Sequence, residues 1–271
     1  MPAMPDFYTS SRPMPLDQAD GLRRLFGGRR RAVLPLVSNP HVAFGGVVLD
    51  RLAQALAAQG RHVLVVDAAT GSPPPAELAA VDLALCIETL APRVAYLAAG
   101  GLATAYVDTR GCADGLIDAV QRAHPSADVV ILHADASDLV RVFKRRTARP
   151  LLLGADHPES IKHAYAGAKL LATRCDLLTF DLVLATSPRS PRAAAIVQSV
   201  AGCAEAFLGA LIVHHALVDP AAAAAGDDVD DGLARLLAAQ LALDEGGFAP
   251  LPASIPAFPS AAGPRRAAGQ R

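Results

Sequence analysis

The sequence predicts an α/β fold: a doubly wound, mostly parallel sheet with helices on both faces. Two observations support this class. Runs that are apolar throughout recur along the chain, such as residues 128–134 (DVVILHA), and such runs are typical of parallel strands buried on both faces. Amphipathic segments with helical spacing lie between them. Strands that alternate with helices in this way build parallel sheets.

Each element follows from local patterns. A strand is predicted at residues 32–37, then a helix from about 46 to 59, which Gly60 ends. A buried strand at 62–68 carries Asp67 near its end. The further predicted strands are 94–100, 104–109, 128–134, 149–156, 178–187 and 211–218. The further predicted helices are 73–90 (a loop and helix), 112–127, 137–148, 158–175 with Pro158 in its first turn, 191–209 and 232–245.

Composition narrows the function classes. The 271 residues carry a net charge of −1, are 52% hydrophobic and only 4% aromatic, and contain no Trp. The chain has no overall positive charge and few aromatic side chains on which bases could stack, so specific nucleic-acid binding is not indicated. The four cysteines form no CxxC pair, so we expect reduced thiols and no metal site. No signal peptide or membrane-spanning run is evident, so we expect a cytoplasmic protein.

The chain divides into five parts by composition. We expect a disordered N-terminus, a short amphipathic helix with a basic Gly/Arg linker, an α/β domain, a linker with a short helix, and a disordered Pro/Ala/Gly-rich tail. Their bounds are 1–15, 16–31, 32–220, 221–245 and 246–271.

The candidate site lies where the strands end, because ligands of open α/β sheets bind at the carboxyl ends of the strands. The segments concerned are 38–46, 67–71 and 133–138. Residues 34–69 read as strand, loop, helix and strand, which is where a nucleotide-binding protein holds its phosphate loop. The glycines at 45 and 46 open the helix, so weak anion binding remains open.

Four segments together resemble the MinD/ParA group of deviant Walker ATPases, and within it the FlhG (FleN) family of flagellar number regulators. They are residues 17–23 (DQADGLR), 38–67, 156–171 and 203–220. In that family the DQAxxLR element docks on the GTPase FlhF and stimulates hydrolysis. The resemblance implies that Asp17, Gln18, Leu22 and Arg23 bind an FlhF-type GTPase; the alternative is a helix that packs on its own domain.

The nucleotide loop departs from the family pattern. The signature lysine of the family falls on Pro40, the phosphate-loop lysine on Gly45 and the Mg²⁺-binding Thr on Gly46. In the family, one strand ends in D-A-D, and the position of its second Asp is occupied by Ala69 in this chain. The Asp that usually ends the next core strand is replaced by His133. The degenerate nucleotide loop therefore comprises Asn39, Pro40, His41, Gly45, Gly46, Asp67 and His133.

These departures predict a pseudo-ATPase with no catalytic residue and no cofactor, because phosphoryl transfer depends on positioning and charge stabilisation. ATP and Mg²⁺ enter only if the degenerate loop still binds them. The alternative is an active MinD-like ATPase that dimerises on ATP and cycles on the membrane. It needs a substitute cation, for which Arg110, Arg141 and Lys144 are candidates. His41 with His133 could form a metal pair, but filling of a vacated polar pocket is the preferred interpretation.

Two further surfaces have candidate partners. The basic cluster of Arg141, Lys144, Arg145 and Arg146 is expected to bind acidic surfaces of the flagellar switch (C-ring) or FlhF, or to be a solvated helix face. The helix at 232–245 lies where MinD-type proteins carry a membrane helix. Its polar positions are mostly acidic or neutral, so we expect packing on the domain and weak or absent membrane association. The resemblance places the protein in the cytoplasm or peripherally at the cell pole.

Overall fold

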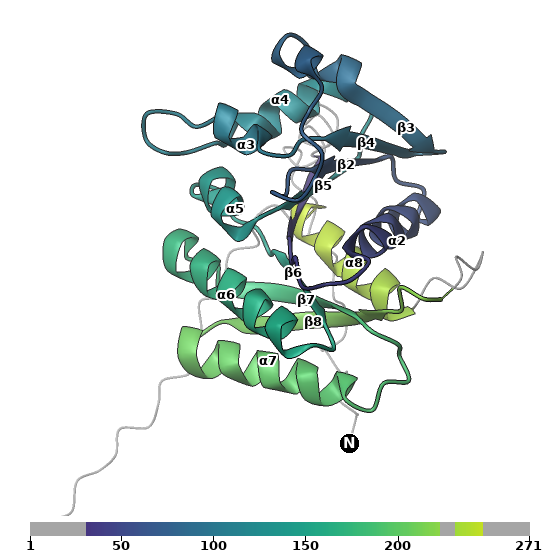
Figure 1. The fold of residues 1–271 in the computed structure, drawn as a ribbon, viewed down its shortest axis with the longest axis vertical. Helices are drawn as coiled ribbons and strands as arrows, with labels where there is room; N and C mark the ends of the chain where they lie inside the picture. Colours follow the sequence, from purple (N-terminus) through teal and green to yellow (C-terminus); the bar gives the residue numbers. More distant parts are fainter. Residues whose placement is uncertain (1–30, 223–230, 246–271) are drawn as a thin grey trace, which may run out of the picture.

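The computed structural model describes residues 31–222 and 231–245. An eight-stranded sheet forms its centre, with strand order β3-β4-β2-β5-β1-β6-β7-β8 (Figure 1). β3 pairs antiparallel with β4, and every other pair of neighbouring strands is parallel. The predicted fold class is confirmed. The strands are β1 (Ala32–Val37), β2 (Val63–Asp67), β3 (Ile87–Ala91), β4 (Val94–Ala98), β5 (Val129–Ala134), β6 (Leu151–Ala155), β7 (Thr179–Ala185) and β8 (Leu211–Val218).

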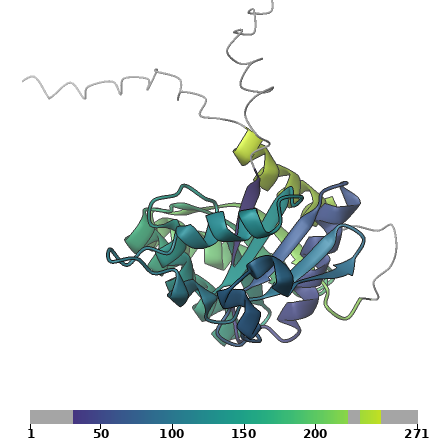
Figure 2. The same ribbon diagram turned by 90° about the horizontal axis from the view of Figure 1, so that it is seen from above.

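Helices cover both faces of the sheet (Figures 1 and 2). The α-helices are α2 (Gly45–Ala58), α3 (Leu102–Ala105), α4 (Gly115–Ala123), α5 (Ala136–Phe143), α6 (Pro158–Cys175), α7 (Ala193–Leu208) and α8 (Asp231–Glu245). Two short 3-10 helices, η1 (Glu77–Ala80) and η2 (Leu83–Cys86), precede β3. α2 and α8 pack on one face and α3 to α7 on the other, which gives the sheet a separate hydrophobic core on each side.

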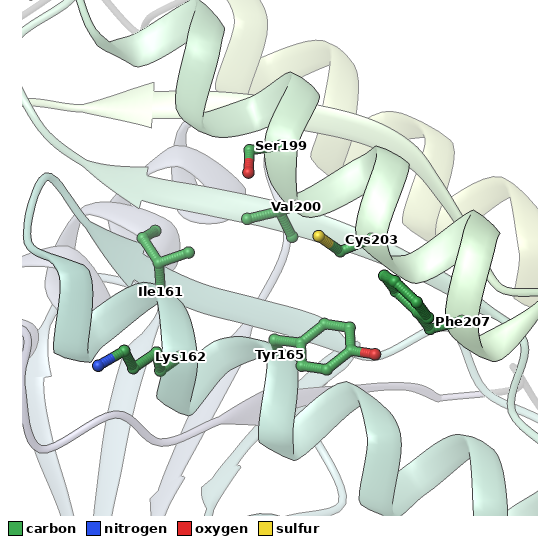
Figure 3. Close-up of a pocket in the computed structure, with 7 residues that line it drawn as sticks. All are labelled: Ile161, Lys162, Tyr165, Ser199, Val200, Cys203 and Phe207. Atoms are coloured by element: carbon green, nitrogen blue, oxygen red, sulfur yellow. The ribbon is translucent and has the colours of Figure 1, made fainter.

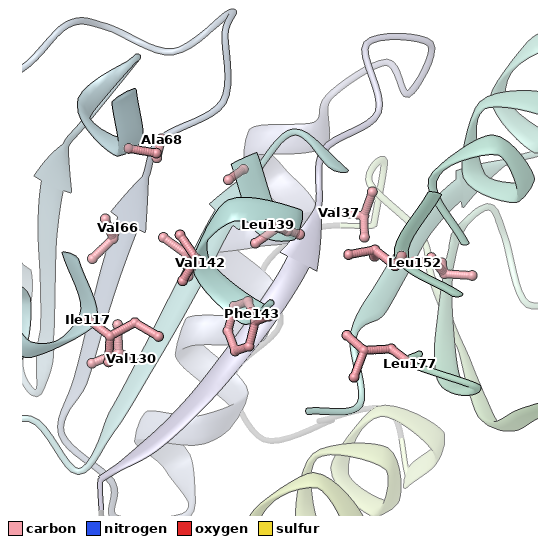
Figure 4. Close-up of a cluster of buried hydrophobic side chains, with 14 of the residues drawn as sticks. Val37, Val66, Ala68, Ile117, Val130, Leu139, Val142, Phe143, Leu152 and Leu177 are labelled. Atoms are coloured by element: carbon pink, nitrogen blue, oxygen red, sulfur yellow. The ribbon is translucent and has the colours of Figure 1, made fainter. Parts of the chain in front are cut away.

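The core under α3 to α7 is formed by aliphatic side chains from the middle strands and the inner faces of these helices (Figure 4). Phe143, at the end of α5, is 3% exposed in this cluster. The opposite core includes a leucine stripe of α8, formed by Leu233, Leu236, Leu237 and Leu241. The expectation that residues 232–245 pack on the domain is therefore confirmed, and in the described part of the chain no helix has the length and apolarity to span a membrane.

Helix ends follow the predicted signals. α2 ends before Gly60, whose φ is 81° and whose N–H donates to the carbonyl of Ala57. Glycine reaches this left-handed conformation without the strain that a Cβ would add. α6 begins with Pro158 in its first turn, where the missing N–H has no intrahelical partner to lose.

Three predicted elements were wrong. Residues 73–90 were expected to end in a helix, but they form η1, η2 and most of the edge strand β3. Residues 104–109 were expected to be a strand, but Thr104 and Ala105 finish α3 and a turn follows. The helix expected at 137–148 stops at Phe143.

Candidate functional site

The loop between β1 and α2 is held by Asn39, which is 7% exposed. Its Nδ2 donates to the carbonyl oxygens of Leu153 (2.7 Å) and Ser160 (2.9 Å) and lies 3.1 Å from the Ser160 hydroxyl. Its Oδ1 accepts from the backbone N–H of His41 at 3.1 Å. One buried amide thus ties the loop to the end of β6 and the first turn of α6.

The backbone of this loop is also committed to internal contacts. Pro40 has no N–H, that of His41 is taken by Asn39, and that of Val42 donates to the Asn39 carbonyl at 3.1 Å. A phosphate cradle needs successive N–H groups that converge on the anion. At positions 40–42 the chain offers none.

Phe44 precedes α2 in a left-handed conformation with φ 61°, and its side chain is 71% exposed. A bulky residue in this region is unusual, and local strain of this kind gathers at functional sites. Gly45 and Gly46 follow as the first residues of α2. A Cβ at Gly45 would lie 3.9 Å from the nearest atom, and one at Gly46 would meet nothing within 4 Å. Lack of space for a side chain therefore does not explain why glycine occupies either position.

Asp67 and His133 meet at the carboxyl ends of β2 and β5, as their alignment at the same register position requires. His133 Nδ1 lies 2.7 Å from Asp67 Oδ1, and the carboxylate also accepts from the hydroxyls of Ser72 and Tyr96. Burial raises the pKa of Asp67, but these hydrogen bonds, that of His133 foremost, outweigh it and leave the pKa below its ordinary value. Burial, together with the Asp67 charge, raises the pKa of Tyr96 to about 12.

Asp135 is a second acid at this edge, in the segment 133–138 but not singled out from the sequence. It accepts from the hydroxyls of Ser38 and Thr70 and from the backbone N–H of Thr70 at 3.3 Å. These hydrogen bonds outweigh the effect of burial, so the pKa of Asp135 lies below its ordinary value. The sequence feature that could have identified Asp135 is an acidic residue directly after an apolar strand.

Both acids thus have a pKa below the ordinary value and accept hydrogen bonds from side chains of the protein itself. In the described part of the chain, no lysine or arginine side chain bonds to residues 38–46. Arg141, one candidate substitute cation, pairs with Asp138 in its own helix. His41 stacks edge-on against His163, with ring centroids 5.7 Å apart, rather than against His133. Among the described residues no group of three or more potential metal ligands gathers.

The four residues of the basic cluster differ in their surroundings. Arg146 pairs with Asp118 at 2.9 Å, and Arg141 with Asp138, whereas Lys144 and Arg145 are exposed. Arg149 lies 2.9 Å from the fully buried Asp181, beneath α8.

Asp17, Gln18, Leu22 and Arg23 lie outside the described residues.

Comparisons with known proteins bear on the fold. No protein-family model and no curated protein sequence matches the chain. Among solved structures, the MinC:MinD cell division protein complex of Aquifex aeolicus matches with a TM-score of 0.50 at 13% identity, over 70% of this chain and 82% of that one. The fold is that of the MinD/ParA-type P-loop NTPases.

Two further solved structures match the chain with lower TM-scores. A ParA family ATPase from Chlorobium tepidum matches at 16% identity and a TM-score of 0.47, over 70% of this chain and 84% of that one. Cobyrinic acid a,c-diamide synthase from Mycobacterium smegmatis, solved with an ATP analog and magnesium, matches at 16% identity and a TM-score of 0.46, over 64% and 82%. At these identities the likeness concerns the fold alone.

Proposed function

We propose that the protein is a non-catalytic regulator, a pseudo-ATPase scaffold on a MinD-like fold. The proposal rests on the contacts of the loop after β1. Asn39 ties this loop to β6 and α6, positions 40–42 present no free N–H, and no cation bonds to it in the described part of the chain. These residues do not fit Mg²⁺-ATP.

The loss of phosphate contacts sets the size of the effect. A hydrogen bond to a charged group contributes about 1.5–3 kcal/mol, and the family pattern places two lysines and a hydroxyl where this chain has Pro40, Gly45 and Gly46. Losing even two such contacts removes at least about 3 kcal/mol, which corresponds to a 100-fold or greater loss of affinity.

Calorimetry with ATP and ADP at millimolar concentration and with Mg²⁺ tests this part of the proposal. We expect no saturable heat. Saturable binding tighter than about 100 μM, near −5.5 kcal/mol, would overturn it and support the alternative, an active MinD-like ATPase with ATP-driven dimerisation and membrane cycling.

We further propose that the scaffold serves flagellar biosynthesis by presenting residues 17–23 to an FlhF-type GTPase. The resemblance of DQADGLR to the activating element of the FlhG family supports this. In this role Gln18 helps to order the water that attacks GTP on the partner. The exposed Lys144 and Arg145 are the proposed contacts for acidic surfaces of flagellar switch (C-ring) proteins, with the complex at the cell pole.

The partner role is tested by GTP hydrolysis of an FlhF-type GTPase with and without this protein. Gln18→Ala should abolish the stimulation. Gln54→Ala, on the exposed side of α2, is the matched control and should stimulate as the unchanged protein does. Equal stimulation by both variants would refute the role of Gln18, and no stimulation by the unchanged protein would refute the partner.

A further inference from the structure

A groove lies between α6 and α7 (Figure 3). Its volume is about 350 Å³. Ile161 and Tyr165 line it from α6, and Val200, Cys203 and Phe207 line it from α7. Its walls are thus mostly apolar, with an aromatic ring on each.

The groove is poorly covered at its Phe207 end. Phe207 is 76% exposed at the last turn of α7. Two leucines at the start of the neighbouring strands are also exposed, Leu178 by 46% and Leu211 by 54%, and the N–H of Leu211 donates to the Leu178 carbonyl. Exposed apolar surface of this kind, beside a groove, marks a site where another segment binds.

We propose that the chain's own residues 248–259 (FAPLPASIPAFP) occupy this groove. The segment has a proline at positions 250, 252, 256 and 259, and proline drives its neighbours toward extended, polyproline II backbone. With three residues per turn, Phe248 and Leu251 share one face, as do Ile255 and Phe258. Proline-rich segments of this form dock in grooves lined by aromatic residues, as Tyr165 and Phe207 line this one.

The path of the chain permits the contact. In α8, Gln240 donates to the carbonyl of Arg149, two residues before β6 begins. Phe207 is in the last turn of α7, four residues before β8 begins. The last described residue of α8 and the open end of the groove are thus both at the edge where β6 to β8 start. From Glu245 to Phe258 a polyproline II chain reaches roughly 40 Å at 3.1 Å per residue, comparable with the diameter of a domain of this size.

Two other occupants are distinguishable from this one. The N-terminal stripe of Leu22, Leu25 and Phe26 would present a helix rather than a proline-rich strand, and it carries acids beside it. If a second copy of the chain occupied the groove, the occupied fraction would rise with protein concentration. Binding within one chain is independent of concentration, because the tether fixes the effective concentration of the segment.

The test is the rate at which a maleimide modifies Cys203 in the full chain, resolved by peptide mass spectrometry. Cys86, at the end of η2 beside β3, which is the edge strand opposite β8, is the internal reference. The test variant is Phe248→Ser with Phe258→Ser. The matched control is Leu22→Ser with Phe26→Ser, which removes as many apolar side chains from the other end. Neither variant alters a described residue, so circular dichroism should be unchanged in both.

We expect the tail variant to modify Cys203 about fivefold or more faster than the unchanged protein does, relative to Cys86. The control variant should leave the rate unchanged. Equal rates in the tail variant and the unchanged protein would overturn the proposal. So would an acceleration confined to the control variant, which would assign the groove to the N-terminal segment, or protection that disappears on dilution, which would assign it to a second copy.

Discussion

Replacing Asn39 by alanine tests whether the loop after β1 is held from within. The amide donates to the carbonyls of Leu153 and Ser160 and accepts from the N–H of His41. Alanine leaves these groups without the partner, and each buried group left unsatisfied costs about 1–3 kcal/mol. Counting two such groups, because His41 is exposed and water can reach it, we expect a loss of about 2–6 kcal/mol.

Urea unfolding followed by circular dichroism measures this loss. For a slope near 2–3 kcal/mol/M, the expected loss moves the midpoint by about 1–2 M. Gln54→Ala serves as the control, since its amide makes one exposed 3.4 Å contact within α2, and its effect should stay within about 0.5 kcal/mol.

Asn39→Asp separates the hydrogen bonds from the packing. The aspartate keeps the shape but points a carboxylate oxygen at the carbonyls of Leu153 and Ser160, so at neutral pH it should destabilise at least as much as alanine does. An Asn39→Asp protein as stable as the unchanged one, or an Asn39→Ala loss below about 0.5 kcal/mol, would refute the reasoning.

Three further predictions concern the same edge of the sheet and one helix. A Cβ at Gly100 would lie 2.4 Å from the Ser72 carbonyl oxygen, whereas one at Gly202 in α7 meets nothing within 4 Å. In thermal or urea unfolding, Gly100→Ala should therefore lower the free energy of unfolding by roughly 2 kcal/mol or more. Gly202→Ala should raise the free energy of unfolding by about 0.5–1 kcal/mol. Of the four tyrosines, Tyr96 should ionise last in an absorbance titration, at a pKa of about 12, and Asp67→Asn should bring that step down; an unmoved step would contradict the assignment. Because the folded pKa of Asp67 is below its ordinary value of 3.8, the stabilisation that Asp67 provides is present above that value and is lost as the pH falls through the folded pKa. The difference in free energy of unfolding between the unchanged protein and Asp67→Asn should thus shrink as the pH falls below 3.8, and a constant difference would count against this account.

The fold was largely predictable because most of its strands and helices have clear local sequence patterns. β1, α6 and β8 begin and end at the predicted residues. β3 was missed because its middle residues Glu88, Thr89 and Leu90 are all exposed, so neither face gives an alternating pattern; its antiparallel pairing with β4 makes it a strand. The strand predicted at 104–109 followed residue propensity, but the left-handed Gly101 begins a helical turn that the Thr104 hydroxyl supports through the Gly101 carbonyl.

The site was predictable in position but not in its contacts. The approach of Asp67 to His133 follows from parallel strands that end at the same edge. The role of Asn39 could not be read from the sequence, because its partners Leu153 and Ser160 are 114 and 121 residues away. Asp135 likewise depends on Ser38 and Thr70, from two other strand ends. Contacts that depend on tertiary placement leave no periodicity in the chain.

The position of α8 has a consequence for how the protein is made. Its leucines complete the core that β1, β6, β7 and β8 share with α2, yet residues 231–245 are synthesised after every strand of the sheet. While the chain grows on the ribosome, this apolar sheet face stays open until α8 emerges. A nascent chain that stalls before residue 231 therefore exposes apolar surface of the kind that promotes aggregation.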